Sequence, residues 1–250
     1  MSYKIKFDDI TSVQVESQKT MNAWEEAIAS LNKAMSDFIN NQNLQGQAIS
    51  SMRNYLVEVH GTLLQTLVNL MNDYSTNLLL YKDGYYQIDS SNHAKLPGQV
   101  FTTLHSDLKS SRDNLKSEIE LLNTTKDKIS DLVSYSGSSH TSTVMNYNFL
   151  MNQVKNLDNS IIQYESNHAS QDLVAFKELL SATKALIAEH AGKTRTVGTY
   201  QSGDFAKLQS VQRFAMAYQQ ATKQMESRVE RVQAAQERDK ARFEALAAED

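Results

Sequence analysis

The fold is decided at residues 35–60, which read MSDFINNQNLQGQAISSMRNYLVEVH. The run Asn40-Asn41-Gln42-Asn43 interrupts helical structure, because asparagine side chains compete for backbone hydrogen bonds and favour turns. Apolar residues at helical spacing lie on both sides of this run. Two long amphipathic helices joined by a short connection form an antiparallel hairpin. The stretch therefore predicts a helical hairpin that turns at Leu44-Gln45-Gly46.

Helical periodicity extends outward from this turn in both directions. A first helix is expected over Thr11 to Asn41, where Thr11 and Gln14 have the spacing of a capping box. A second helix is expected over Leu44 to Asp89, and its roughly 44 residues correspond to a rod on the order of 65 Å. Each helix carries one narrow apolar stripe. The stripes are Met21, Trp24, Ile28, Leu31, Met35 and Phe38 in the first helix, and Ile49, Met52, Leu56, Val59, Leu63, Leu67, Leu70, Tyr74, Leu78, Tyr81, Tyr85 and Ile88 in the second.

The remaining chain continues as long helices separated by few loops. Asp89 to Gly98 is a polar break that holds the only proline, Pro97, which suits the first turn of a helix over roughly Pro97 to Val133. A Ser/Gly-rich loop at Ser134 to Ser142 precedes a helix whose apolar phase slips near Ser170, which indicates a kink or a break. The other predicted segments are a loop at Ala191 to Gly203, a last helix from Asp204 and, within it, a linker-like stretch with little to bury at Gln233 to Asp250.

Composition favours an all-α protein. The chain of 250 residues contains eight glycines and one proline, so it has few turns and long segments. Only Tyr3 to Phe7 shows the alternation of a strand. Narrow stripes pair helices into a rod and leave room for helices of other chains. We therefore expect an elongated all-α rod of long antiparallel helices, arranged as residues 1–90 (the hairpin), 97–203 (central helices) and 204–250 (a C-terminal helix and charged linker).

Charge and hydropathy exclude several classes of partner. The formal net charge is -4, and lysine and arginine are scattered, so no basic face for nucleic acid is expected. No apolar run approaches the roughly 18 residues that a membrane span requires. The first ten residues lack the pattern of a cleaved signal peptide, and the absence of cysteine excludes disulfides and thiolate metal sites.

The motifs that could carry chemistry are incomplete. Glu165 and His168 form one Glu-x-x-His pair, whereas a di-iron bundle needs two such pairs and two further carboxylates. Gly192-Lys193-Thr194 lacks the upstream glycine and strand of a phosphate-binding loop. The six histidines are dispersed, and no nucleophile elbow or zinc-protease motif occurs. We expect no catalytic site, no metal site and no cofactor.

The hairpin turn gives the most specific signal. Leu44-Gln45-Gly46 follows a helix that ends Met35-Ser-Asp-Phe38 and precedes the helical stretch Ala48 to His60. This arrangement resembles the LXG family, the N-terminal domains of toxins exported by the type VII secretion system of Gram-positive bacteria. The resemblance covers about the first 200 residues. From the residues alone, Gly46 is expected to allow close approach of two backbones and Leu44 to cover the end of the apolar seam.

The resemblance implies a function in export. The chain would be a targeting domain that binds small WXG-like helical partner or chaperone proteins and is presented to a secretion ATPase. It would be cytoplasmic before export and then secreted without a cleaved signal peptide, with a toxic enzyme following residue 250. WXG-type proteins carry a Tyr-x-x-x-Asp/Glu signal after their second helix, and Tyr85 and Asp89 have that spacing here. They are the candidate export signal.

The partner-binding surface is expected on the hairpin. Trp24, Ile28 and Leu31 lie in mid-stripe on the first helix, and Leu56, Leu63 and Leu70 line the facing one. A two-helix hairpin needs further helices to form a bundle, which either a partner or the chain's own later helices could supply. A structural coiled-coil or tether protein is the alternative function.

Overall fold

The computed structural model describes residues 3–134, 140–190 and 197–249. This part of the chain is almost wholly helical, which confirms the all-α prediction. It divides into two compact units. The first comprises Met1–Phe7 with Ile88–Ser166, and the second comprises Asp8–Gln87 with Asn167–Asp250. Each unit is described separately below.

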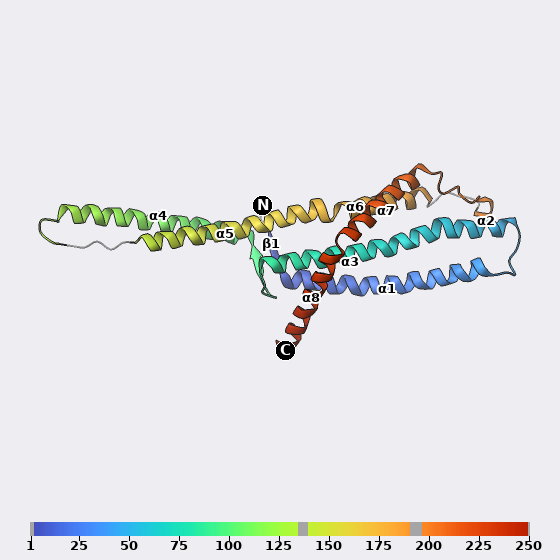
Figure 1. The fold of residues 1–250 in the computed structure, drawn as a ribbon, viewed down its shortest axis with the longest axis horizontal. Helices are drawn as coiled ribbons and strands as arrows, with labels where there is room; N and C mark the ends of the chain where they lie inside the picture. Colours follow the sequence, from blue (N-terminus) through green and yellow to red (C-terminus); the bar gives the residue numbers. More distant parts are fainter. Residues whose placement is uncertain (1–2, 135–139, 191–196, 250) are drawn as a thin grey trace. The chain divides into compact units, whose positions relative to one another are not determined.

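The second unit is built on the predicted hairpin (Figure 1). Helix α1 (Phe7–Asn40) is followed by α2 (Gln47–Tyr55), a π-helical turn (Leu56–Gly61) and α3 (Thr62–Ile88), which run on as one rod antiparallel to α1. The capping box at Thr11 and Gln14 was wrong, because α1 begins four residues before Thr11. The chain enters α1 directly from a strand, and Asp8 and Asp9 complement the dipole in its first turn.

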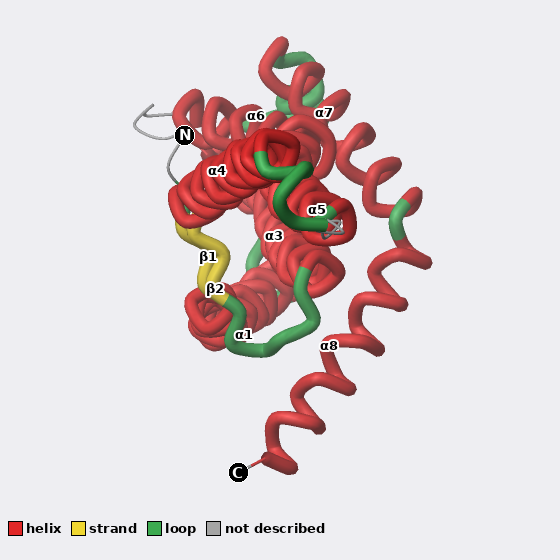
Figure 2. The backbone as a smooth tube through the Cα atoms, turned by 90° about the vertical axis from the view of Figure 1, so that its left-hand side faces the viewer, coloured by secondary structure: helices red, strands yellow, loops and turns green. Residues whose placement is uncertain are grey.

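The apolar core of this unit lies between α3 and two later helices, α6 (Val174–His190) and α7 (Gln209–Ser227). Its buried residues are Val59, Leu70, Ala175, Leu179, Ala182, Leu186, Tyr200, Phe205, Phe214, Ala217 and Ala221. Figures 1 and 2 show α3 between α1 on one side and α6 with α7 on the other. The chain's own helices therefore cover one face of the hairpin, while α1 lies at the edge.

The last helix is α8 (Val229–Glu249), and it packs against α3. The expectation that Gln233 to Asp250 has little to bury was therefore wrong. Ala235 is fully buried against Leu79 and Leu80 of α3. The stretch also forms ion pairs with α3, so its charges belong to a packed interface. The single expected C-terminal helix is divided at Arg228, whose backbone (φ -116°, ψ 11°) leaves the helical conformation.

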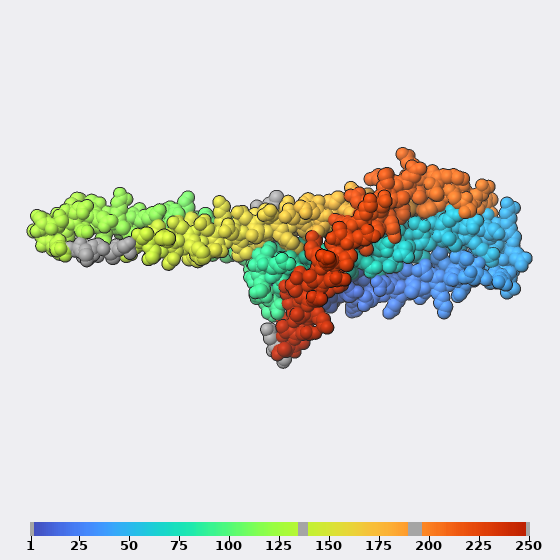
Figure 3. All heavy atoms as spheres, in the orientation of Figure 1, coloured from blue at the N-terminus to red at the C-terminus, as the bar shows by residue number. Residues whose placement is uncertain are grey.

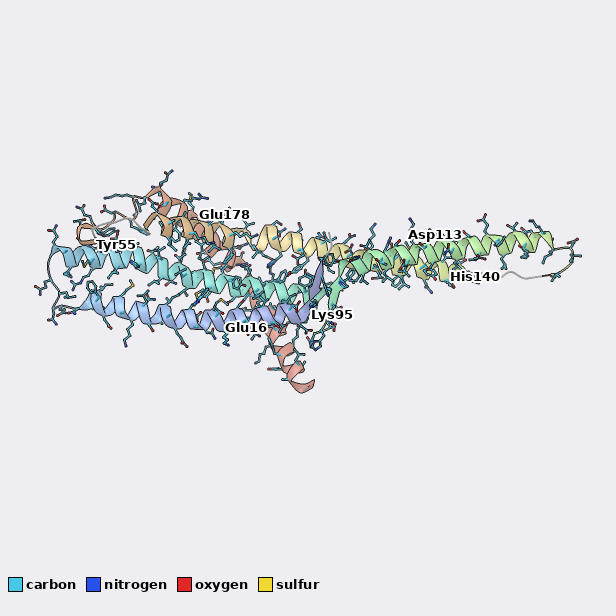
Figure 4. The ribbon with its side chains drawn as sticks, turned by 180° about the vertical axis from the view of Figure 1, so that it is seen from behind. Glu16, Tyr55, Lys95, Asp113, His140 and Glu178 are labelled. Carbon is cyan, nitrogen blue, oxygen red and sulfur yellow. The ribbon has the colours of Figure 1, made fainter. Side chains whose placement is uncertain are left out.

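The first unit is a second helical hairpin with a small sheet at its base. Helices α4 (Gly98–Lys128) and α5 (Thr141–Asn167) run antiparallel, and Arg112 Nη1 donates to Asn148 Oδ1 at 2.9 Å between them. Strands β1 (Lys4–Lys6) and β2 (Lys95–Pro97) pair antiparallel, with Ile5 opposite Leu96. The strand expected at the N-terminus is thus present. Figure 2 shows both strands in yellow, and Lys95 is labelled in Figure 4.

The predicted irregularities fall close to their expected positions. Pro97 immediately precedes α4. The phase slip near Ser170 corresponds to a π-helical turn over His168–Asp172, which inserts an extra residue between α5 and α6 and so rotates the apolar stripe. In the loop predicted at Ala191 to Gly203, a short 3-10 turn occupies Val197–Thr199.

Candidate partner-docking site

The Leu-x-Gly turn is fixed by a side chain from the following helix. The last turn of α1 contains no basic residue to offset the partial negative charge of its carbonyl groups. Arg53 of α2 supplies that charge, because its Nη2 donates to Asn41 O at 2.5 Å and to Leu44 O at 3.1 Å. Asn43 N donates to Asn41 Oδ1 at 3.0 Å within the turn. Arg53 therefore ties both sides of the turn together.

Gly46 is required for a reason other than the expected one. A Cβ atom built on Gly46 would meet nothing within 4 Å, so no second backbone approaches it closely. Its φ of 111° and ψ of 163° are accessible almost only to glycine. The residue turns the chain into α2, whose first hydrogen bond runs from Ser50 N to Gly46 O at 3.0 Å. Leu44 is half-buried beside this turn.

The apolar stripe of α1 is open along its middle. Trp24 is 57% exposed and Leu31 is 47% exposed, although both lie at positions that a bundle would bury. Ile28, between them, is half-buried, and Met21 at the start of the stripe is buried. Large exposed apolar side chains in a row at helical spacing indicate a surface that another helix covers.

This stripe forms one wall of an apolar groove of about 660 Å³. Its floor is α3, through Leu67, Leu70, Met71 and Tyr74. Phe176 and Leu180 of α6 form the opposite wall, and the α1 wall consists of Glu16, Ser17, Thr20, Met21, Trp24, Ala27 and Ile28. The lining holds few polar groups, and these do not converge as they would around a small molecule. The groove is therefore suited to an apolar helix face.

Figures 3 and 4 show the elements that line this groove. Figure 3 shows α1 (blue) and α3 (cyan) side by side, with α7 (orange) lying over α3 and not over α1. Figure 4 labels Glu16 on α1, Glu178 on the α6 side and Tyr55 near the turn end. The small side chains of Ser17, Thr20 and Ala27 on the α1 wall allow a helix backbone to approach closely.

The half of the predicted binding surface on the second helix of the hairpin is partly covered by the chain's own core. Leu70 is only 6% exposed, because it belongs to the core with α6 and α7 while also lining the groove floor. Leu63 packs against the same core, and Leu56 is half-buried in the π-helical turn. The chain itself thus covers much of this face, whereas Trp24, Ile28 and Leu31 remain available.

A second contact holds the turn end of the hairpin. Glu58, in the π-helical turn, accepts hydrogen bonds from Tyr200 Oη at 2.5 Å, Ser202 Oγ at 2.5 Å and Gly203 N at 2.9 Å. The side-chain hydrogen bonds from Ser202 and Tyr200 lower the pKa of Glu58. Burial and the hydrogen bond to Glu58 raise the pKa of Tyr200 to about 12. Tyr55 also packs edge-on against Tyr200. Residues 200–203 therefore bind the turn end of the hairpin through both Glu58 and Tyr55.

Tyr85 and Asp89 lie at the end of α3. Tyr85 is fully buried and packs edge-on against Tyr81, so its ring faces the interior. Asp89 follows the last residue of α3, and its Oδ1 accepts a hydrogen bond from Ser91 N at 2.9 Å. A signal read from the Tyr85 ring would require this part of the chain to open. The export role of the pair remains a prediction.

His168 has a structural environment. It is buried, its Nδ1 lies 3.1 Å from Asp172 Oδ2, and its ring packs against Tyr81. Arg231 pairs with Asp172 from the other side at 2.6 Å. Among the described residues, no cluster of three or more metal-ligating side chains is present, and no helix is apolar over a length that would cross a bilayer. Gly192-Lys193-Thr194 lies outside the described residues.

Sequence reasoning missed the residues that fix this arrangement. Arg53 and Glu58 were counted only as part of the hairpin's second helix, although each receives or donates several hydrogen bonds at the turn end. The available signal was a charged residue in a partly apolar helix directly after a turn. The partners of Arg53 are backbone carbonyl groups, and those of Glu58 lie in a loop about 140 residues away. Residue spacing encodes neither set of contacts.

The fold and the turn together define a class: an all-α protein with an N-terminal helical hairpin turned by Leu-x-Gly. The model of the LXG domain of the WXG superfamily matches residues 7–203. The chain belongs to this family. No curated protein matches the sequence. The matched region begins at the first residue of α1 and ends within the segment that clasps Glu58, so α7 and α8 lie beyond it.

Proposed function

We propose that this chain is a secretion-targeting domain that docks small WXG-like helical proteins for export of a toxin by the type VII system. The observation that carries the proposal is the groove between α1 and α6, lined by apolar side chains and bordered by the exposed Trp24. Membership of the WXG superfamily supports helix pairing as the mode of recognition. The resulting complex would be the form presented to the secretion ATPase.

Covering Trp24 would contribute substantially to the binding of a partner helix. An aromatic side chain such as Trp24 buries on the order of 150–250 Å² when covered. At about 25 cal/mol per Å², covering its exposed part contributes on the order of 2–3 kcal/mol. Leu31 extends the same stripe toward the turn, beyond the groove itself. A helix laid along α1 would cover both, and α1, α3, α6 and the partner helix would form a four-helix arrangement. The domain itself would catalyse no reaction.

The test compares two exposed leucines. Leu31→Asp places a charge on the open stripe of α1, whereas Leu121→Asp does the same on α4, where Leu121 is 62% exposed. Both variants should fold, because both side chains already contact water. Tagged chains are purified from the native host, the co-purifying small helical proteins are identified, and the exported chain is measured in the medium.

We expect the wild type and Leu121→Asp to retain the small helical protein and to be exported. Leu31→Asp should lose both properties with an unchanged helical signal. Retention of partner and export in Leu31→Asp would overturn docking on α1. Equal loss in the two variants would show that any added charge is damaging and would likewise contradict a specific docking surface on α1.

A further inference from the structure

Helix α8 is held on α3 mainly by charge. Arg238 of α8 donates two hydrogen bonds to the Asp83 carboxylate of α3, from Nε to Oδ1 and from Nη2 to Oδ2, each at 2.8 Å. Arg242 reaches the same carboxylate at 3.4 Å. One residue earlier on α3, Lys82 pairs with Asp239 at 2.8 Å. Bidentate arginine–carboxylate pairs of this kind also fix geometry.

The apolar contribution at this interface is small. The buried cluster shared by the two helices consists of Ala235 with Leu79 and Leu80, joined by the half-buried Val232. Phe243 remains partly exposed, with the Lys82 ammonium 4.4 Å from its ring centre. By contrast, α7 is held by a large apolar core. The two C-terminal helices are therefore attached by different means.

The charges also define a register. On α3 a cation, Lys82, directly precedes an anion, Asp83; on α8 a cation, Arg238, directly precedes an anion, Asp239. In the structure each faces its opposite. A shift of α8 by one residue would bring Lys82 toward Arg238 or Asp83 toward Asp239. Like charges in contact are disfavoured, so this pattern selects one alignment, a role for which interhelical charges are well attested.

The junction between α7 and α8 is a break in the helix at an anchored residue. Arg228 interrupts the helix there, and its buried guanidinium pairs with Asp73 and donates to Asn77 Oδ1 at 2.7 Å. Burial raises the pKa of Asp73 even though Arg228 opposes that effect. These contacts hold the end of α7 on α3 separately from the ion pairs that hold α8. The surface left on α3 carries Lys82 and Asp83, which water solvates well, beside the apolar side chains Leu79 and Leu80.

We propose that α8 is a detachable strap: it docks on α3 in one register set by the Lys82–Asp239 and Asp83–Arg238 pairs, and it swings about Arg228 to uncover the end of α3. Release uncovers Tyr86, whose ring is stacked 3.8 Å from the Arg242 guanidinium in the closed form. The strap lies beyond residue 203, where the family match ends. The inference is independent of partner docking in the groove. Figures 1 and 3 show α8 (red) lying across α3.

The experiment uses the absence of cysteine from the sequence. Spin labels are attached to the exposed positions Asn72→Cys on α3 and Gln236→Cys on α8, and their distance distribution is measured in the full chain. A second labelled pair, Lys177→Cys on α6 and Lys223→Cys on α7, reports whether the core remains folded. The charges are then changed by Lys82→Asp, by Asp239→Lys and by both substitutions together.

The wild type should give a narrow distribution for the α3–α8 pair. Each single substitution places like charges in contact and should broaden the distribution and shift it to longer distances, while the α6–α7 pair stays narrow. The double substitution restores opposite charges and should restore the narrow distribution. A narrow α3–α8 distance in both single variants, or failure of the double variant to recover it, would overturn the proposal. Broadening of both pairs in a single variant would also contradict it, because α8 would then not move independently of the core.

Discussion

Gly46 offers a test that separates two explanations of the Leu-x-Gly turn. The backbone at Gly46 has φ 111° and ψ 163°, a conformation that costs other residues about 1–3 kcal/mol. A Cβ atom there would meet nothing within 4 Å. If backbone conformation is the reason for glycine, Gly46→Ala and Gly46→Leu should cost nearly the same. If close packing were the reason, the larger side chain would cost 1–3 kcal/mol more.

The assay is hydrogen exchange at the turn. The Ser50 amide donates to Gly46 O, and the Leu44 amide donates to Asn41 O at 3.3 Å, so both report on opening of this segment. A cost of about 1–3 kcal/mol corresponds to a loss of protection of roughly 5- to 150-fold, since each 1.4 kcal/mol is a factor of ten. Gly61→Ala is the control: Gly61 ends the π-helical turn without a positive φ and has room for a methyl group, so protection should stay equal or rise. A much larger loss in Gly46→Leu than in Gly46→Ala would refute the backbone explanation.

Three further outcomes follow from the same structure. Arg53→Met should lower protection of the turn by about 1–2 kcal/mol, because two charge-assisted hydrogen bonds to carbonyl groups are lost at a partly exposed site. Arg213→Met on α7 is the control. Equal protection in both variants would contradict the role of Arg53. Because the folded-state pKa of Glu58 is lowered, its contribution to stability should be complete above the ordinary pKa of about 4.3 and be lost as the pH falls through the lowered folded-state pKa. Amide protection near Tyr200, measured relative to the intrinsic exchange rate at each pH, should therefore fall in acid, and Glu58→Gln should remove that dependence. Leu70→Ala should lower the melting temperature through a cavity cost of about 2–5 kcal/mol, whereas Trp24→Ala should barely change it; equal losses would show that Trp24 belongs to the core.

Local patterns in the sequence predicted the helices and the hairpin turn well. The α1 stripe, the polar run at Asn40 and the phase slip near Ser170 each follow from side-chain spacing, and the structure has a helix, a turn and a π-helical insertion at those places. The start of α1 was misplaced because strand β1, which leads directly into α1, pairs with β2 and so fixes where the helix begins. Phe7 N donates to Ala94 O at 3.1 Å, a contact between residues 87 positions apart that periodicity does not encode.

The candidate site was predicted in part for a similar reason. Exposed and buried members of one stripe have the same spacing, so Trp24 and Leu70 could not be told apart until α6 and α7 were in place. The stretch Gln233 to Asp250 was interpreted as a linker with little to bury, because it consists mainly of alanine and charged residues. Arg238 and Asp239 instead meet Asp83 and Lys82 of α3, and only the folded chain brings these complementary pairs together.

The most direct test of the central proposal uses the single tryptophan. Trp24 is the only tryptophan in the sequence and borders the groove, so its fluorescence reports on that surface alone. In the free chain, with Trp24 57% exposed, acrylamide should quench the emission efficiently. Addition of the purified helical partner, in a tryptophan-free form, should shift the emission to shorter wavelength and protect it from quenching. Full binding of that partner with no change in the emission or quenching of Trp24 would contradict docking in this groove.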